Sequence, residues 1–346
     1  MPFTANELAN ISNALLDFHV KGAAMSQVLQ SRPLFDKLMG NQKTFPGGQG
    51  LITKPVKGNY TTGIQGFTHD DTVSYSNPAN VRRLSAKWYE IHAGISMTAT
   101  ELKMAGISMV DSTSMGQTTN HSDQELVQLT NLLDDKIDDM MEGFARSFTQ
   151  MLWLDGTQDP KAVAGIRSFI LDVPASAGST FGIDRGANSW WRNRAVLNID
   201  STTASNQNLV QTLQFEIRQL RRFGGKPDLF PCGSLFLDAF EKELRSKGNY
   251  TLEGWAKGGR IDASVADLSF KGIDLIYDPV LDDLGFSKYG YLIDTKHLFL
   301  MVMDGEDRKI HTPARPAEKY VLFRAITWTG ALISDQLNSC GVYSIL

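Results

Sequence analysis

The longest regular pattern of apolar positions runs from residue 126 to residue 151. Eight apolar residues recur there at steps of three or four: Leu126, Leu129, Leu133, Ile137, Met140, Phe144, Phe148 and Met151. Their mean spacing of 25/7 residues matches the ~3.6-residue period of an α-helix. Ser122 and Glu125 fit a capping box before the pattern, and Gly156 follows it. The sequence therefore predicts one helix over about residues 122–153, with a single apolar stripe that should pack across a sheet.

Shorter patterns predict further helices and strands. A helix over Leu209–Arg222 should bury one face, formed by Leu209, Leu213, Ile217 and Leu220. Two more helices are predicted, over Ser234–Lys247 and around Leu8, Ile11, Leu15 and Phe18. Strands are predicted at Asp228–Cys232, Gly272–Tyr277, Tyr289–Met303 and Lys319–Thr329, while residues 165–198 are expected to be loop-like. Because helices are intermixed with hairpin-like strand pairs, the expected fold class is α+β.

Between residues 57 and 97 the pattern predicts a long hairpin. Lys57–Phe67 is rich in Gly and Thr, His69–Asp71 forms a polar tip, and Val81–Met97 favours β-structure. The alternative is an ordinary pair of surface loops. Few of these residues could build a core of their own, so we expect the hairpin to pack on another surface.

Composition and charge exclude several classes of protein. The 346 residues are 42% hydrophobic and 21% charged, which is typical of a folded chain. A net charge of −4 argues against a nucleic-acid binder that relies on bulk charge. No apolar run approaches the length of ~18 residues needed to span a membrane, and the first 30 residues do not resemble a secretory signal. Cys232 and Cys340 are the only cysteines, so a disulfide scaffold is excluded and two free thiols are expected.

Two segments carry candidate chemistry. Asp134–Asp139 contains a DDxxD string of the kind that holds Mg²⁺, but a solvated helix face explains it better. Trp190–Arg194 combines aromatic and cationic residues, as do single-strand binders, and Arg218, Arg221, Arg222 and Lys226 form a second basic cluster. In an acidic chain, packing or contacts between subunits are favoured over nucleic-acid binding. Without hydrolase, nucleotide or zinc motifs, we predict no catalytic, cofactor-binding or metal-binding residue.

Several short motifs resemble one family. They are Ile95–Leu102, Asp155–Thr157 followed by Gly165-Ile166, Gly182–Arg185 followed by Asn188–Asn193, and Arg324, Trp328 and Gly330 near the C-terminus. In these motifs and in the order of its segments, the chain resembles the major capsid proteins of tailed bacteriophages, with the Hong Kong 97-like fold also found in encapsulins. The likeness extends over nearly the whole chain from about residue 50.

The resemblance implies a division of the chain. Residues 1–50 would be an N-terminal arm, residues 51–95 an extended E-loop hairpin, and residues 96–200 a peripheral domain that contains the long spine helix. Residues 201–305 would be an axial domain, and residues 306–346 a C-terminal strand that returns to the peripheral domain as one long closing strand.

The resemblance also implies a structural function. The chain would assemble with itself, as hexamers and pentamers, into an icosahedral shell of the virion, built in the cytoplasm of the host bacterium. Expected partners are a separate scaffolding protein, a portal, a decoration protein and non-specifically held packaged DNA, with no membrane and no cofactor. Residues expected at contacts between subunits are Tyr60, Ile64, Phe67, Trp190, Trp191 and Arg192.

Other functions remain open at this point. An encapsulin-type nanocompartment shares the fold, and a more remote alternative is an α+β enzyme of unknown activity. One branch of the capsid family joins an E-loop lysine covalently to an asparagine near the C-terminus, with help from a glutamate. Lys54 or Lys57 and Asn338 are available here, but no glutamate follows Glu318, so no cross-link is predicted.

Overall fold

The computed structural model describes residues 31–58, 62–75, 80–104, 123–201, 208–246, 269–311 and 321–346. The chain divides into two compact units. The first comprises Met1–Gln30, Ile91–Phe148 and Gly305–Trp328, and the second comprises Ser31–Glu90, Thr149–Asp304 and Thr329–Leu346. The helix predicted near Leu8 and Phe18 lies outside the described residues.

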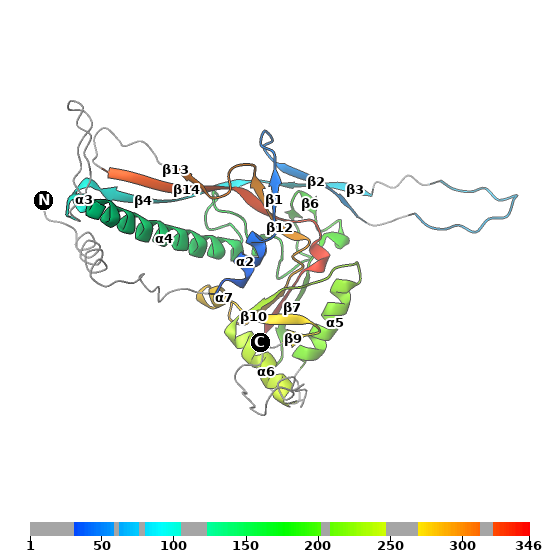
Figure 1. Ribbon diagram of the computed structural model, residues 1–346. Coiled ribbons are helices and arrows are strands. Elements are labelled where there is room, and N and C mark those ends of the chain that lie inside the picture. Colours follow the sequence, from blue (N-terminus) through cyan, green and yellow to red (C-terminus); the bar gives the residue numbers. More distant parts are fainter. Residues whose placement is uncertain are drawn as a thin grey trace. The chain divides into compact units, whose positions relative to one another are not determined.

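The first unit is built on one long helix and a set of strands (Figure 1). Its elements are β4 (Tyr89–Thr98), α3 (Ala99–Met104), α4 (Asp123–Trp153), β13 (Lys309–His311) and the first part of β14 (Val321–Ser334). β14 pairs with β4 and, in antiparallel register, with β13. The range of α4 matches the helix that the apolar periodicity predicts.

The predicted stripe of α4 packs on β14. Phe144 and Phe148 are buried, with ring centres 5.6 Å apart, and the Phe148 ring lies 4.7 Å from that of Trp328. Lys136 on α4 also forms an ion pair of 2.5 Å with Glu101 on α3, whose side chain is almost fully buried. The stripe therefore meets a sheet, as expected, over the residues whose side chains are described; those of Leu126, Leu129 and Leu133 lie outside that part.

A six-stranded sheet forms the larger layer of the second unit. Its order is β7 (Arg194–Ile199), β15 (Gly341–Ile345), β11 (Tyr289–Leu292), β8 (Phe230–Cys232), β10 (Ile273–Tyr277) and β9 (Ser269–Phe270). Three helices accompany it: α5 (Leu209–Arg221), α6 (Ser234–Ser246) and α7 (Pro279–Asp283). The predicted apolar face of α5 is fully buried against this sheet, and this confirms the helix phase.

Buried carboxylates hold α5 in place at its N-terminal end and in its middle. Glu243 of α6 accepts hydrogen bonds from the amides of Leu209 and Val210 at 2.9 and 3.1 Å. These amides belong to the first turn of α5, which has no intrahelical partners for them. Glu216 accepts two hydrogen bonds from Arg194 of β7 at 2.7 and 2.8 Å, a bidentate pair with one side buried.

The second unit also contains a smaller set of paired strands and a separate two-stranded ladder. β1 (Gln42–Phe45), which follows α2 (Pro33–Met39), pairs in parallel with β12 (Leu298–Met303). β12 pairs in turn with the last part of β14. The ladder itself consists of β2 (Ile52–Lys57) and β3 (Val81–Ala86), and β5 (Ser179–Thr180) pairs with β6 (Ile183–Asp184) nearby in the chain.

Four strand predictions need correction. The run Val81–Met97 is not one arm of a hairpin, because β3 ends at Ala86 and β4 then pairs with β14. The run Tyr289–Met303 is split into β11 and β12, and the segment expected to be loop-like contains β7.

The fourth correction concerns the C-terminus. The expected single closing strand is interrupted by a 3₁₀ turn at Leu337–Ser339, after which β15 lies between β7 and β11. The three errors in strand bounds have one cause: apolar alternation reports a strand but not the partner that gives the strand its ends.

Candidate functional site

The most exposed described segment of the second unit projects from the β2–β3 ladder (Figure 1). The two strands pair in antiparallel register from Ile52 opposite Ala86 to Lys57 opposite Val81. Leu84 is fully buried at the base of the ladder. Beyond the ladder, residues 62–75 contain no strand, which corrects the expectation that Lys57–Phe67 forms an extended β-arm.

Local hydrogen bonds close the tip of this segment. The amide of Asp71 donates to the carbonyl of Thr68 at 2.9 Å, and the amide of Thr68 donates to the Asp71 carboxylate at 2.8 Å. The hydrogen bond from the Thr68 backbone lowers the pKa of Asp71. Across the two arms, the amide and hydroxyl of Ser74 donate to the side-chain oxygen of Gln65 at 3.3 and 3.1 Å.

Large apolar side chains on this segment face solvent. Ile64 is 105% exposed relative to its reference, Tyr75 94% and Phe67 63%. Single exposed apolar residues are ordinary, but several on one projecting segment mark an interaction surface. We call residues 62–75 the tip segment.

The first anchor of the ladder is the loop that contains β5 and β6. The amide of Ser85 on β3 donates to the carbonyl of Phe181 at 2.9 Å. At the end of β2, Gly58 lies against the indole of Trp190, because a Cβ atom added to Gly58 would come within 2.6 Å of the ring. The backbone and the indole meet closely only because residue 58 has no side chain.

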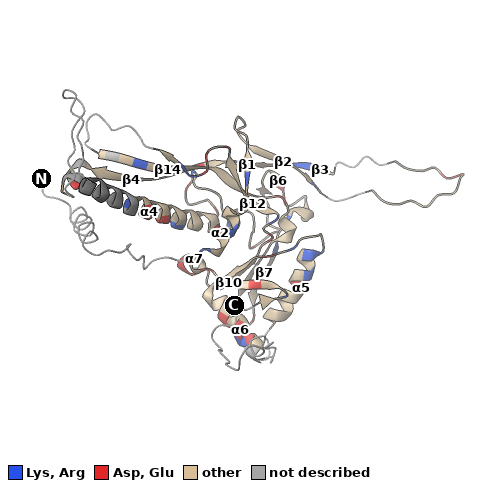
Figure 2. Cartoon of the chain, viewed as in Figure 1, with Lys and Arg blue, Asp and Glu red and all other residues tan. Residues whose placement is uncertain are grey.

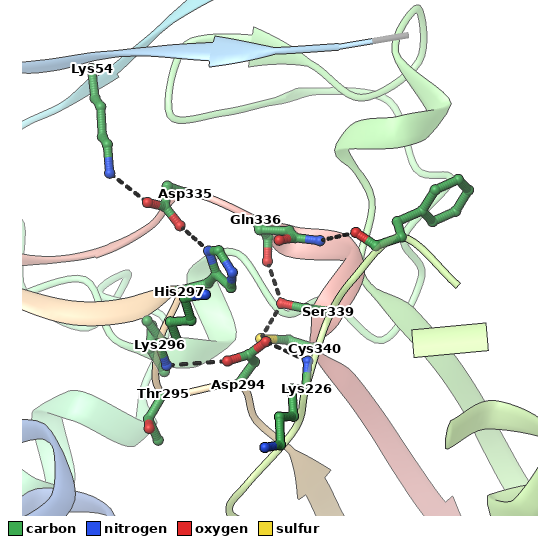
Figure 3. Close-up of polar contacts among 12 residues, drawn as sticks. Lys54, Lys226, Asp294, Thr295, Lys296, His297, Asp335, Gln336, Ser339 and Cys340 are labelled. Atoms are coloured by element: carbon green, nitrogen blue, oxygen red, sulfur yellow. Dashed lines mark hydrogen bonds and ion pairs between the residues drawn. The ribbon is translucent and has the colours of Figure 1, made fainter. Parts of the chain in front are cut away.

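The second anchor is a charged cluster, of which Figure 3 shows Lys54, His297 and Asp335. Asp335 accepts from Lys54 of β2 at 2.5 Å and lies 2.7 Å from Nδ1 of His297. Lys43 of β1 lies 3.5 Å from the centre of the Phe299 ring, and Lys54 lies 5.2 Å from the same centre. Burial, with a smaller effect of Lys54, lowers the pKa of Lys43, and Asp335 opposes this change. The Asp335 carboxylate thus contacts the Lys54 ammonium and the His297 imidazole, and it also attracts the Lys43 ammonium.

The predicted contact residues fall into two groups. Ile64 and Phe67 are exposed on the tip segment, and Tyr60 lies outside the described residues. Trp191 is buried, and its indole N–H donates to the carbonyl of Thr180 at 3.0 Å, so it offers no surface to a neighbour. Physically, the tryptophan fills the core under the β5–β6 loop, and sequence alone does not separate an internal aromatic from an external one.

The other two members of that motif also act within the chain. Trp190 is half-buried against Gly58. Arg192 donates to the carbonyl oxygens of Arg185 at 2.7 Å and of Gly186 at 3.0 Å. The motif therefore braces the loop that anchors the hairpin.

Sequence reasoning missed the charged cluster. Lys54 and Asp335 are 281 positions apart, and nothing local in the sequence links them. Of the residues considered for a covalent cross-link, Lys54 is already engaged by Asp335.

The described part of the chain contains neither a metal-binding cluster nor a membrane-spanning helix. No group of three or more His, Cys, Asp or Glu side chains there could hold a metal ion. Of the aspartates in Asp134–Asp139, Asp138 and Asp139 are exposed, as a solvated helix face requires, and the side chains of Asp134 and Asp135 are not described. No described helix has the length and apolar character needed to cross a bilayer.

Comparison with solved structures identifies the fold. A chain of the cyanophage A-1(L) capsid asymmetric unit gives a TM-score of 0.68 at 12% identity, over 94% of this chain and 95% of that chain. The native GTA particle capsid gives 0.57 at 12% identity, and the capsid of Myoviridae phage XM1 gives 0.55 at 11%, with the same coverage of 94% and 95%. The chain has a phage capsid fold. The α+β class and the fold implied by the resemblance are thereby confirmed. No protein-family model and no curated protein matches the sequence.

Proposed function

We propose that this chain is the major capsid protein of a tailed bacteriophage and assembles into the shell of the virion. The observation that carries the proposal is the tip segment, which exposes Ile64, Phe67 and Tyr75 on a fold shared with phage capsid chains. Apolar side chains held away from their own core need a partner surface, and in a shell that surface belongs to a neighbouring copy.

The finer assignments follow the capsid resemblance. The E-loop, expected over residues 51–95, is now proposed to end with β3 at Ala86, because β4 pairs with β14. Residues 96–200 act as the peripheral domain, 201–305 as the axial domain, and 1–50 and 306–346 as terminal segments. Hexamers and pentamers of the chain form the shell in the host cytoplasm. A separate scaffolding protein and a portal assist, a decoration protein binds outside, and packaged DNA lies against the inner face.

The contact role is now proposed for a narrower set of residues. Ile64 and Phe67 remain the central candidates, and Tyr60 stays a candidate from the sequence. Trp190 and Arg192 are proposed to act by bracing the hairpin base.

The encapsulin alternative uses the same fold. The solved structures to which this chain is similar include capsids of phages and of a GTA particle, and this supports the phage assignment over a cargo compartment. The proposed role is structural and requires no catalytic group, so an enzyme is the least favoured alternative.

Electron microscopy of the purified chain tests the proposal. Wild-type protein, with or without a co-expressed scaffold, should form closed shells. Replacing residues 59–77 by a short Gly-Ser turn should leave the far-UV spectrum and a cooperative melt in place, because the buried elements are untouched, yet abolish shells or make them fragile. Loss of the subunit fold would instead place this segment in a core.

A point-variant pair sharpens the test. I64S/F67S removes the exposed apolar contacts of the tip segment, whereas V173S removes an apolar residue that is 61% exposed elsewhere in the same unit. The first variant should assemble poorly and the second normally. Equal, robust assembly of both would overturn the E-loop assignment.

A further inference from the structure

The C-terminal end of α5 is basic and faces solvent. Residues 218–226 contain four cationic residues and no acidic one. The side chains of Arg218, Arg221, Arg222 and Lys226 are exposed, and none forms an ion pair with a residue in the part of the chain that the structure describes. Four like charges on so short a segment favour an anionic partner. We call residues 218–226 the basic segment.

Two exposed aromatic side chains accompany these charges. Phe215 is 48% exposed and Phe223 is 64% exposed. The guanidinium of Arg222 lies 5.5 Å from the centre of the Phe223 ring. Aromatic and arginine side chains are together enriched at protein–protein interfaces. The composition of this surface therefore favours a protein partner.

An acidic counterpart lies on β10 and α7 of the same unit. Residues 273–283, which we call the acidic segment, contain four aspartates and no cationic residue, and all of these aspartates except the buried Asp278 are at least partly exposed. Asp274 and Asp283 are exposed. Asp282 accepts a hydrogen bond from the hydroxyl of Tyr277 at 2.8 Å, and this bond raises the pKa of Tyr277 to about 12. Tyr277 is 43% exposed and stays neutral, so the segment presents the Asp282 carboxylate beside an exposed aromatic ring.

The two segments lie toward opposite edges of one sheet. α5 contacts β7, which is the strand at one edge, whereas β10 is next to the other edge. Figure 2 shows the cationic residues on α5 and acidic residues at α7. A subunit with opposite charges at its two edges is complementary to a copy of itself in head-to-tail order. Head-to-tail contacts close into rings when the rotation between copies permits.

We propose that the basic segment of one subunit docks on the acidic segment of a neighbouring copy. This inference rests on the proposed capsid function and names a contact within the shell other than the hairpin. A nucleic-acid partner would use the basic segment but gives no role to the acidic one, and the chain as a whole carries a charge of −4.

Charge reversal of each segment tests the pairing. R218E/R221E/R222E makes the basic segment acidic, and D274K/D283K reverses the charge of the two exposed aspartates of the acidic segment. Each variant alone brings like charges together, which should lower the yield of closed shells by about tenfold or more. The combined five-substitution variant should recover shells, because its charges are again complementary.

A mixture of the two variants measures the pairing without requiring shells. The altered basic segment of one variant and the altered acidic segment of the other carry opposite charges. Sedimentation of the mixture should therefore detect mixed oligomers, whereas neither variant should form oligomers alone. Wild-type failure to form shells, with mixed oligomers present, would count against the capsid function and not against the pairing.

Three results would overturn the inference. The first is a shell yield at the wild-type level from either reversed variant. The second is the absence of mixed oligomers when both variants are folded. The third is that R218E/R221E/R222E loses binding to duplex DNA but keeps its self-association. Far-UV spectra and melts verify folding in each case. The control R146E/K161E, which reverses two exposed cations outside both segments, should assemble at the wild-type yield.

Discussion

Asp278 is an ionisable residue placed in a fully buried position where α7 begins. Its carboxylate accepts hydrogen bonds from the Trp153 indole and from the amide of Val280, both at 3.0 Å. Burial raises the pKa of Asp278 from 3.8 to about 6, and the two hydrogen bonds only partly oppose this rise. Asp278 thus links the last residue of α4 to the first turn of α7.

The raised pKa of Asp278 makes the stability of the chain depend on pH. Because the folded state binds this proton more tightly than the unfolded state, the stabilising effect is complete below about pH 4 and is lost as the pH rises to about 6. The free energy of unfolding should fall by about 3 kcal/mol across this window through this residue. Urea unfolding of wild type and D278N at several pH values measures the difference in slope.

The exposed D274N variant is the control for that measurement. It should keep the wild-type slope, whereas D278N should lose most of it, whatever its absolute stability. An unchanged slope in D278N would show that the carboxyl is not responsible.

At the scale of elements, helices are more predictable from this sequence than strands. The apolar positions of α4 and α5 repeat locally, so the sequence indicates both the range of each helix and its buried face. The paired partner of a strand is remote: β2 pairs with β3, and β4 instead pairs with β14, more than 200 positions along the chain. The sequence predicts the strand but not the partner strand with which it pairs.

The residues of the candidate site also divide into those that the sequence predicts and those that it does not. The exposure of Ile64 and Phe67 follows from a segment with too few apolar residues to build a core, so the sequence indicates it. The burial of Trp191 and the charged cluster at Asp335 depend on contacts made by the whole second unit. No local pattern in the sequence predicts either of these two features.

Replacing either residue of the Lys54–Asp335 ion pair should lower the free energy of unfolding, but by unequal amounts. D335N leaves Lys43 and Lys54 close together without their carboxylate, and should cost about 1–2 kcal/mol. K54M removes a side chain that is 44% exposed, and should cost less than about 1 kcal/mol. A double-mutant cycle in urea should show coupling between them.

Lys57 offers a matched control on the same strand, because its side chain is exposed. K57M should change stability by less than about 0.5 kcal/mol. If the effects of K54M and D335N simply add, the cluster does not act as a unit.

At the scale of the whole molecule, the two cysteines report on opening of the second unit. Both are free and fully buried, and burial raises the pKa of Cys232 to about 12 and that of Cys340 to about 11. Thiol labelling of the native chain near pH 8 should therefore be slow, since it requires the structure to open and the thiolate to form.

Labelling in denaturant without reductant should give two thiols per chain. A count near zero there would mean that the cysteines are oxidised. Fast labelling of the native chain would contradict the burial of Cys232 in β8 and of Cys340 before β15.

The position of β15 has a consequence for how the six-stranded sheet holds together. β15 lies between β7 and β11, so among the described strands β7 is hydrogen-bonded to the rest of the sheet only through β15. A variant without Gly341–Ile345 would therefore leave β7 without a paired strand, and the second unit should lose its cooperative melt. A strand next to the edge thus acts as a fastener for the edge strand beyond it.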